Sequence, residues 1–141
     1  MKRTGSAVWT GGLKEGAGKL STQSGTLRET PYSFSARFES GAGTNPEELI
    51  AAAHAGCFAM ALSAQLGGAN ITPAKIEATA EVSLEKLDAG WTITASHLRV
   101  SLHAPGADRA ACEKAAGEAK VNCPVSRLLK ANVTMDLTVA V

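Results

Sequence analysis

The chain of 141 residues has few cysteines, few aromatic residues and almost no net charge. Its three cysteines are odd in number and widely spaced, so they do not form the disulfide framework of a small secreted protein. Because 14 basic residues are nearly balanced by 13 acidic ones, the sequence lacks the excess of positive charge that is typical of proteins that bind nucleic acid or an anionic membrane surface. A small neutral partner fits this composition better.

Several targeting and cofactor-binding motifs are also missing. The two basic residues near the N-terminus are not followed by an apolar run, so the segment is not typical of a signal peptide. The longest apolar stretch contains His54, Ser63 and Gln65 and falls short of the ~20 residues that a membrane span requires. The sequence has no phosphate-binding glycine loop, no nucleophile elbow and no Cys-x-x-Cys pair. We therefore expect a cytoplasmic protein with no cofactor, in which a disulfide would be transient and catalytic.

The order of the sequence patterns predicts one α+β domain over residues 1–141, with mostly antiparallel sheets around two central helices. Short strands joined by glycine turns are expected in the first forty residues. Residues 32–38 alternate as a further strand, with Arg37 on its polar face. The remaining strands are expected at residues 76–84, at 91–95 with 98–102 after a bulge near Ser96, and at 133–139; the helices are expected at residues 44–66, at 110–121 and, as a short turn, after Cys123.

The start of the long helix has two candidate caps. Thr44 and Glu47 have capping-box spacing, and Asn45 is a rival N-cap, while Pro46 occupies the first helical position. The many Ala and Gly residues that follow allow a neighbouring backbone to approach closely. We therefore expect the second helix to pack against this one.

Two cysteines suggest a redox site. Cys57 lies inside the long helix, and Cys123 precedes Pro124 at the start of the short turn. By local physics Cys123 is the better thiolate, because unpaired amides at the start of a helical turn favour a negative charge. Cys57 lies about twelve residues into its helix and needs another source of positive potential, for which Arg37 is the nearest candidate in the sequence.

Each of these residues also has a purely structural interpretation. A free cysteine in an alanine-rich helix often only fills space, and for Cys112 packing is the favoured interpretation. Arg37 alone suits a solvated strand, and Glu47 alone suits a helix cap. His54 and Cys57 share a helix face as two metal ligands would, but only two further histidines are present, so a metal site is disfavoured.

In these motifs and in several others, the chain resembles the OsmC/Ohr family of thiol-dependent hydroperoxide reductases over nearly its whole length. The motifs that carry the resemblance are Ala7-Val8-Trp9-Thr10-Gly11, Ser24-Gly25, Thr44-Asn45-Pro46-Glu47-Glu48-Leu49, Ala53-His54-Ala55-Gly56-Cys57 and Cys123-Pro124-Val125-Ser126. The Ala-His-Ala sequence before Cys57 and the segment Tyr32-Ser33-Phe34 are similar to the OsmC branch rather than the Ohr branch.

The resemblance implies an OsmC-like fold, an intertwined homodimer and a set of roles. Cys57 matches the peroxidatic cysteine, Cys123 the resolving cysteine, Arg37 the activating arginine and Glu47 the carboxylate that holds the arginine. It also implies reduction of organic hydroperoxides, and of hydrogen peroxide, in defence against oxidative or osmotic stress. A small thiol or a dihydrolipoyl protein would then reduce a Cys57–Cys123 disulfide.

The resemblance and the local argument favour different cysteines as the activated thiol. We prefer Cys57, because the guanidinium of Arg37 carries a full charge where a helix terminus offers about half a charge. Glu47 and Cys57 are ten residues apart, hence ~15 Å along one helix, which is too far for one arginine to touch both. A two-fold pairing of helices would place Glu47 of one subunit near Cys57 of the other.

Two alternatives remain open at the level of sequence. Phe38, Phe58, Met60 and Leu62 either line an apolar substrate pocket or belong to the ordinary core. The protein is also compatible with a non-catalytic, stress-related binding role in which the same fold carries idle thiols, or with metal binding through His54 and Cys57.

Overall fold

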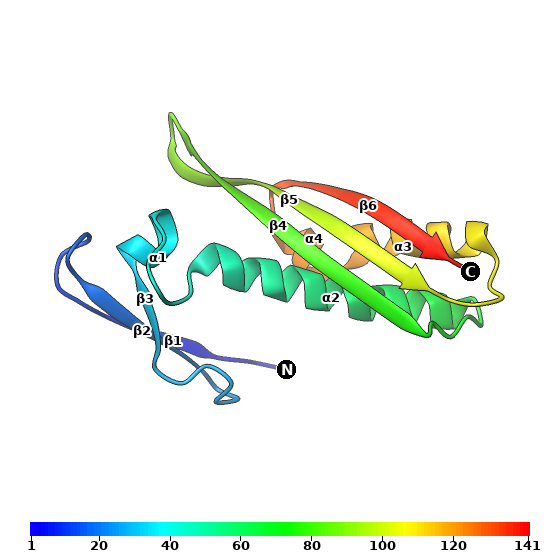
Figure 1. The fold of residues 1–141 in the computed structure, drawn as a ribbon, viewed down its shortest axis with the longest axis horizontal. Coiled ribbons are helices and arrows are strands. Elements are labelled where there is room, and N and C mark those ends of the chain that lie inside the picture. The colour runs from blue at the N-terminus through cyan, green and yellow to red at the C-terminus, as the bar shows by residue number, and fades with distance from the viewer. The chain divides into compact units, whose positions relative to one another are not determined.

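The computed structural model describes residues 1–141, whose contacts divide them into two compact units, Met1–Leu49 and Ile50–Val141. That the whole chain acts as one domain stays a prediction. Figure 1 labels the elements, which in chain order are β1 (Gly5–Thr10), β2 (Ala17–Thr22), β3 (Thr30–Ser33), α1 (Phe34–Phe38), α2 (Pro46–Gly68), β4 (Lys75–Leu87), β5 (Gly90–His103), α3 (Arg109–Asn122), α4 (Pro124–Leu128) and β6 (Asn132–Ala140).

The first unit contains an antiparallel sheet in the order β1-β2-β3. Its register places Gly18 between Trp9 and Tyr32, whose ring centroids lie 5.3 Å apart. A β-carbon on Gly18 would overlap the Tyr32 ring and come within 2.8 Å of the Trp9 ring. The two aromatic residues therefore pack together because the residue between them has no side chain.

The strand predicted for residues 32–38 is wrong beyond Ser33, because Phe34–Phe38 forms the short helix α1. The Ser33 hydroxyl accepts a hydrogen bond from the Ala36 amide at 3.1 Å and caps this helix. Phe34 and Phe38, one helical turn apart, place their ring centroids at 4.8 Å. An alternating pattern with aromatic residues four positions apart fits the period of a strand and also that of a helix. The cap formed by Ser33 stabilises the helix.

Helix α2 begins at Pro46, as predicted, and Asn45 is its cap. The Asn45 side-chain oxygen accepts a hydrogen bond from the Glu48 amide at 2.8 Å, so the alternative capping box of Thr44 and Glu47 is wrong. The Asn45 amide group donates to the Ala36 carbonyl at 3.2 Å. One residue thus joins the end of α1 to the start of α2, and Glu47 is left to make another contact.

The length of α2 also corrects the expectation that the apolar stretch is too short to span a membrane. The helix has 23 residues and is long and apolar enough to do so by length and composition alone. However, its face with His54, Phe58, Leu62 and Leu66 is buried in the protein. The buried share of its apolar window is 22%, so one side of α2 packs inside this chain.

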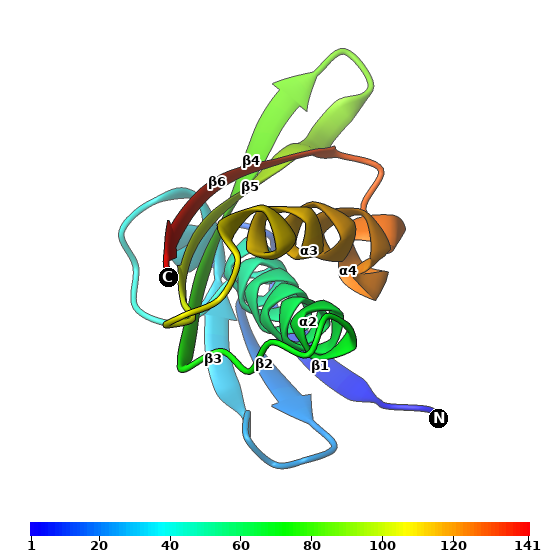
Figure 2. The same cartoon turned by 90° about the vertical axis from the view of Figure 1, so that its right-hand side faces the viewer.

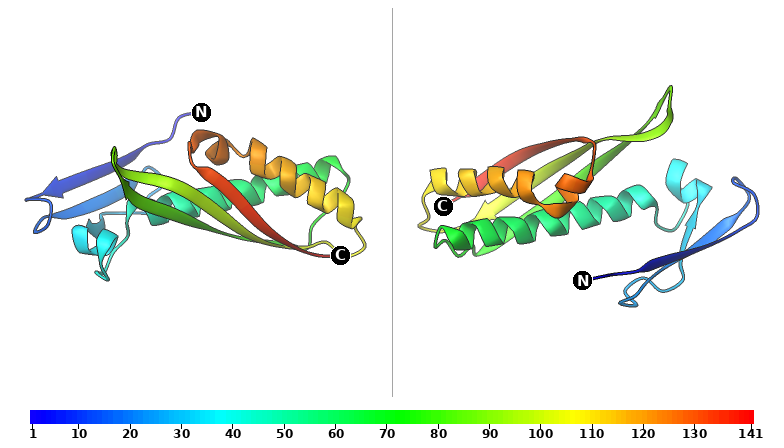
Figure 3. Two further views of the ribbon diagram at one scale, coloured as in Figure 1. Left: turned by 90° about the horizontal axis from the view of Figure 1, so that it is seen from above. Right: turned by 180° about the vertical axis from the view of Figure 1, so that it is seen from behind.

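The second unit is built on a sheet in the order β4-β5-β6, with β4 and β5 antiparallel and β5 and β6 parallel. Figure 2 shows α2 and α3 side by side on one face of this sheet, and Figure 3 shows both helices running along it from two other directions. The core between these layers is formed by Phe58, Leu62, Leu66, Leu98, Val100, Leu102, Ala104, Cys112, Ala115, Ala116, Ala119 and Val139. The α+β class, the mostly antiparallel pairing and the two packed helices agree with the prediction.

Two details of this unit bear on the sequence analysis. The register of β4 and β5 shifts between Ser83 and Leu84, so that no residue of β4 lies opposite Thr94 of β5. This bulge lies two residues from the one predicted near Ser96. Cys112 is completely buried in the core, which confirms the packing interpretation.

Helix α3 begins after Asp108, whose carboxylate accepts a hydrogen bond from the Ala111 amide at 2.8 Å. Cys123 then separates the two helices: it is the C-cap of α3 and the N-cap of α4. Pro124 forces this break, since it has no amide hydrogen to continue α3 and is well suited to the first position of a helix. The sequence therefore fixes Cys123 at a sharp corner of the backbone.

Candidate active site

The two cysteines singled out in the sequence meet in the second unit. Cys57 lies in the middle of α2 and is partly exposed, whereas Cys123 is completely buried at the corner between α3 and α4. Both are free thiols, and their sulfur atoms lie 2.7 Å apart in a hydrogen bond. A disulfide bond is about 2.05 Å long, so a movement of less than about 1 Å would allow the bond to form.

The surroundings of the two sulfurs shift their pKa values in opposite directions. Burial, and then the hydrogen bond with Cys123, raise the pKa of the Cys57 thiol. Burial also acts to raise the pKa of Cys123, but the hydrogen bond with Cys57, the backbone and hydroxyl of Ser126 and the backbone of Val125 outweigh it and lower that pKa. Within this chain the negative charge of the pair therefore favours Cys123, as the local argument from the sequence predicts.

A buried histidine lies beside the two cysteines. His54 precedes Cys57 by one turn of α2, and its Nδ1 lies 2.7 Å from the Ser96 hydroxyl on β5. Its Nε2 lies 2.8 Å from the hydroxyl of Ser126, which follows Cys123 by one turn. His54 thus connects α2, β5 and α4 through two hydrogen bonds.

This network was not predicted from the sequence. There His54 was considered only as a metal ligand, Ser96 only as the position of a bulge and Ser126 only as part of a motif. The available signal was the spacing, because His54 and Ser126 each lie three residues from one of the cysteines. Both ring nitrogens of His54 are now occupied by hydroxyl groups, and no group of three or more His, Cys, Asp and Glu side chains is arranged to hold a metal ion.

The predicted arginine and glutamate meet in the first unit. The Nε of Arg37 donates to Glu47 Oε2 at 3.0 Å, and Nη2 donates to Oε1 at 2.6 Å. This two-point contact is the strongest geometry for an arginine and a carboxylate, and it raises the pKa of Arg37. The Arg37 guanidinium also lies 5.2 Å from the centroid of the Phe38 ring. Glu47 fixes the guanidinium from the first turn of α2.

Along α2 the carboxylate and the thiol occupy separate positions. Glu47 is the second residue of the helix and Cys57 is ten residues further on, a rise of ~15 Å. The structure therefore provides two constellations: a rigid arginine–glutamate pair at the start of α2, and a pair of thiols with a histidine near its middle.

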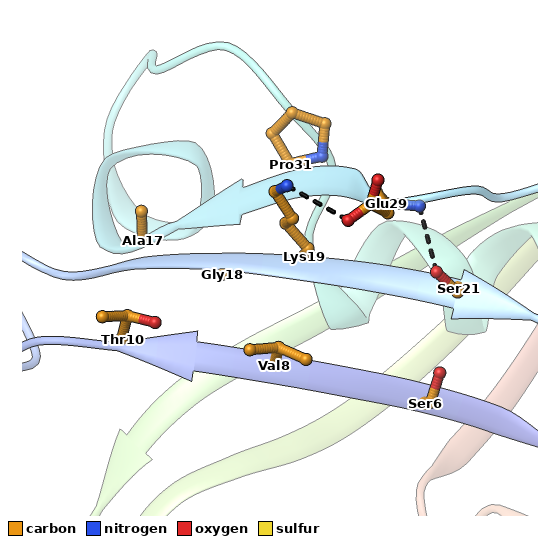
Figure 4. A pocket seen from close by; sticks show the side chains of 9 residues that line it. All are labelled: Ser6, Val8, Thr10, Ala17, Gly18, Lys19, Ser21, Glu29 and Pro31. Atoms are coloured by element: carbon orange, nitrogen blue, oxygen red, sulfur yellow. Dashed lines mark hydrogen bonds and ion pairs between the residues drawn. The ribbon is translucent and has the colours of Figure 1, made fainter.

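A hollow in the first unit is lined by none of the residues of these two constellations. It has a volume of about 590 Å³ and lies on the sheet of the first unit, where Figure 4 shows Val8, Lys19, Glu29 and Pro31 among its lining residues. Lys19 and Glu29 form an exposed ion pair there at 3.2 Å, and no cysteine or histidine lines the hollow. We assign it no catalytic role.

The four residues considered for an apolar substrate pocket divide between core and surface. Phe58 and Leu62 are completely buried core residues, so the ordinary interpretation is right for them. Met60 is 77% exposed on the opposite face of α2, and Phe38 lies in α1. Of the three on α2, only Met60 is therefore available at the surface of this chain.

Comparisons with known proteins agree with these motifs. Residues 39–138 match the family model described as OsmC-like protein. The peroxiredoxin OsmC of Escherichia coli strain K12 is 51% identical over 136 residues, which cover 96% of this chain and 95% of the relative. The organic hydroperoxide resistance protein of Xanthomonas axonopodis pv. citri strain 306 is 32% identical over 101 residues, covering 71% of this chain and 69% of the relative.

A solved structure shares the fold. The crystal structure of the organic hydroperoxide resistance protein OhrB of Bacillus subtilis superposes with a TM-score of 0.71 at 28% identity, covering 97% of this chain and 98% of that chain. The higher identity to the Escherichia coli relative agrees with the branch that the Ala-His-Ala sequence indicates.

Proposed function

Since this chain belongs to the OsmC-like protein family, we propose that it is a thiol-dependent peroxidase that reduces organic hydroperoxides, and also hydrogen peroxide, to alcohols and water. The observation that carries the proposal is the 2.7 Å approach of the Cys57 and Cys123 sulfurs. Two thiols that need only a small movement to form a disulfide supply the two electrons that one O–O bond requires. Oxidative or osmotic stress is the setting in which such an activity would protect a cell.

The first half of the cycle is an oxygen transfer to Cys57. Its thiolate attacks the distal oxygen of the hydroperoxide, the O–O bond breaks, and the alkoxide leaves as an alcohol after it takes up a proton. The sulfur keeps the oxygen as a sulfenic acid. Cys57 suits this role because it is the partly exposed sulfur of the pair, whereas Cys123 is completely buried.

The second half closes the disulfide and reopens it. The Cys123 thiolate attacks the Cys57 sulfenic sulfur and expels hydroxide, which is protonated to water. Two thiol groups of a reductant, either small thiols or a dihydrolipoyl protein, then reduce the disulfide and become a disulfide themselves. No cofactor is needed, because the two sulfurs store the electrons between the half-reactions.

The raised pKa of Cys57 leaves one requirement, which is a positive charge beside its sulfur. We propose that the partner subunit's Arg37 supplies it in a homodimer in which the central helices intertwine. The ~15 Å of helix between Glu47 and Cys57 supports an arrangement in which each site draws on two chains. We place this dimer in solution in the cytoplasm, with no membrane or nucleic-acid partner.

A titration of free thiols tests the peroxidase cycle. The reduced protein is treated with one equivalent of cumene hydroperoxide and its thiols are counted under denaturing conditions. We expect a loss of two thiols per chain, with Cys112 kept because it is buried in the core. No loss of thiols would overturn the proposal and favour the non-catalytic binding protein.

Single-cysteine variants test the separate roles. In Cys123→Ser the sulfenic acid cannot form a disulfide, so dimedone is expected to label Cys57. In Cys57→Ser the peroxidase turnover is expected to be lost. Absence of dimedone labelling at Cys57 in Cys123→Ser, together with labelling of Cys123 and normal turnover in Cys57→Ser, would reverse the two assignments.

A further inference from the structure

His54 has no role in the proposed cycle, although both of its ring nitrogens have hydrogen-bond partners. The ring is completely buried, and each of its nitrogens meets a hydroxyl group at 2.7 Å or 2.8 Å. Burial lowers the pKa of His54, so the ring is held neutral. A neutral imidazole has one N–H donor and one acceptor nitrogen, and the structure provides a partner for each.

The direction of these hydrogen bonds follows from counting protons. A serine hydroxyl has one proton to donate, and a thiolate can only accept. If the Ser126 hydroxyl donates to the Cys123 sulfur, its oxygen must accept from His54, so the proton lies on Nε2. The Nδ1 atom then accepts from Ser96, whose hydroxyl is also completely buried.

We propose that His54 is a positioning residue that holds the Ser126 hydroxyl as a hydrogen-bond donor to the Cys123 sulfur, through the tautomer protonated at Nε2. The proposal rests on the proposed peroxidase function and extends it to the resolving step. With this tautomer each group donates to the next, from Ser96 to His54 and on to Ser126. The Ser126 hydroxyl is hydrogen-bonded to the Cys123 sulfur, which lies 2.7 Å from the Cys57 sulfur. The titratable group that faces Cys123 from α2 is the Cys57 thiol, and α4 contributes the Ser126 hydroxyl and backbone amides.

Such a series acts in both directions of the disulfide chemistry. When the disulfide forms, the lowered pKa of Cys123 makes its thiolate more readily available to attack the Cys57 sulfenic sulfur. When a reductant thiolate opens the disulfide, the sulfur with the lower pKa is the better leaving group. The reductant is then directed to Cys57, where it forms the new S–S bond while Cys123 leaves as the thiolate.

A thiolate titration in the Cys57→Ser background tests the proposal. The absorbance of Cys123 at 240 nm is followed against pH, and the raised pKa of Cys112 keeps its own transition at higher pH. We expect Ser126→Ala and His54→Leu to move the Cys123 midpoint upward. Ser126→Thr keeps the hydroxyl and His54→Gln keeps a donor toward Ser126, so both are expected to restore it. Unchanged midpoints in Ser126→Ala and His54→Leu would overturn the proposal.

The rate of disulfide formation gives a second measurement in the presence of Cys57. After one equivalent of cumene hydroperoxide at pH 6, Ser126→Ala is expected to form the disulfide about tenfold more slowly than the unaltered protein. This factor corresponds to the loss of one hydrogen bond to a charged group. The preceding oxidation of Cys57, read from the loss of hydroperoxide, is expected to keep its rate. A slower oxidation with an unchanged closing step would contradict the proposal.

The tautomer is measured separately by NMR of protein labelled with ¹⁵N-histidine. We expect the His54 ring to be protonated at Nε2, and a ring protonated at Nδ1 would overturn the proposal. The same experiments separate this inference from the proposed function. A protein without peroxidase activity but with the expected midpoints and tautomer would refute the function alone, whereas an active peroxidase with unchanged midpoints would refute only the role of His54.

Discussion

Arg37 illustrates what a single residue contributes and what fixes it. Its guanidinium makes two hydrogen bonds to Glu47, at 2.6 Å and 3.0 Å, and lies over the Phe38 ring. A charge held in this way is in place before the substrate arrives, which is the condition under which a positive group is most useful to a thiolate. In the proposed cycle Glu47 therefore acts on the chemistry through Arg37.

The exchange Glu47→Gln tests this dependence. The variant keeps the size of the side chain but loses its charge, so the guanidinium is no longer fixed at two points. We expect kcat/KM for cumene hydroperoxide to fall by about tenfold to a hundredfold. Glu48→Gln, one residue further along the same helix end and exposed, is the matched control and is expected to keep its activity. Equal activity of the two variants would contradict the role of Glu47.

His54 gives a prediction about stability and pH. Burial lowers the pKa of His54 in the folded protein, so below about pH 6.5 the unfolded chain binds a proton that the folded chain does not. The neutral, buried His54 therefore contributes its full stabilisation at a pH above its pKa in the unfolded chain. As the pH falls toward the lower pKa of the folded protein, this contribution is lost, and the free energy of unfolding changes by at most about 1.4 kcal/mol per pH unit.

Urea unfolding between pH 7 and pH 5 measures this slope. We expect the free energy of unfolding of His54→Gln to depend less on pH than that of the unaltered protein. The control is His103→Gln, which removes an exposed histidine from the end of β5 and is expected to leave the slope unchanged. A parallel pH dependence in all three proteins would show that His54 is not held neutral by burial.

At the scale of elements, short segments are decided by contacts more than by pattern. The segment Phe34–Phe38 alternates like a strand, yet the Ser33 cap and the contact between its two aromatic rings make it a helix. The long helices were predicted well, because α2 and α3 repeat their apolar positions over several turns and each has an Asn or Asp cap. A five-residue helix offers too few positions for one period to stand out.

Two glycine exchanges test the packing of these elements in opposite directions. Gly18→Ala places a methyl group against the Trp9 and Tyr32 rings and is expected to lower the free energy of unfolding. Gly117→Ala lies in α3, where a methyl group meets no atom within 4 Å, and is expected to raise the free energy of unfolding by up to about 1 kcal/mol. Urea unfolding measures both, and a gain in stability for Gly18→Ala would contradict the aromatic packing.

At the scale of the whole molecule, the proposed active site needs two chains. A complementation experiment tests this directly, with Arg37→Gln and Cys57→Ser each expected to be poorly active alone. In a mixed dimer, the intact Cys57 of one chain meets the intact Arg37 of the other, so one site per dimer is complete. We expect activity to appear when the two variants are unfolded together and refolded as a mixture.

The same mixture excludes the alternative. If each site used the arginine and the cysteine of a single chain, mixing would restore no activity. Refolding each variant separately is the control for recovery, and sedimentation of the unaltered protein measures the dimer itself. An active monomer at assay concentration would also contradict a shared site. The proposal that residues 1–141 form one domain predicts a single unfolding transition.

The sequence by itself determined the fold class, the two long helices and the two cysteines of the proposed cycle, because each depends on local periodicity or on a short motif. It also placed Cys123 at a helix start, since Pro124 allows little else. Only the tertiary structure decided which groups meet across the chain: the 2.7 Å approach of sulfurs separated by 66 positions, and the contacts of His54 with Ser96 and Ser126. Those contacts depend on how α2, α4 and β5 pack, and no local pattern in the sequence records that packing.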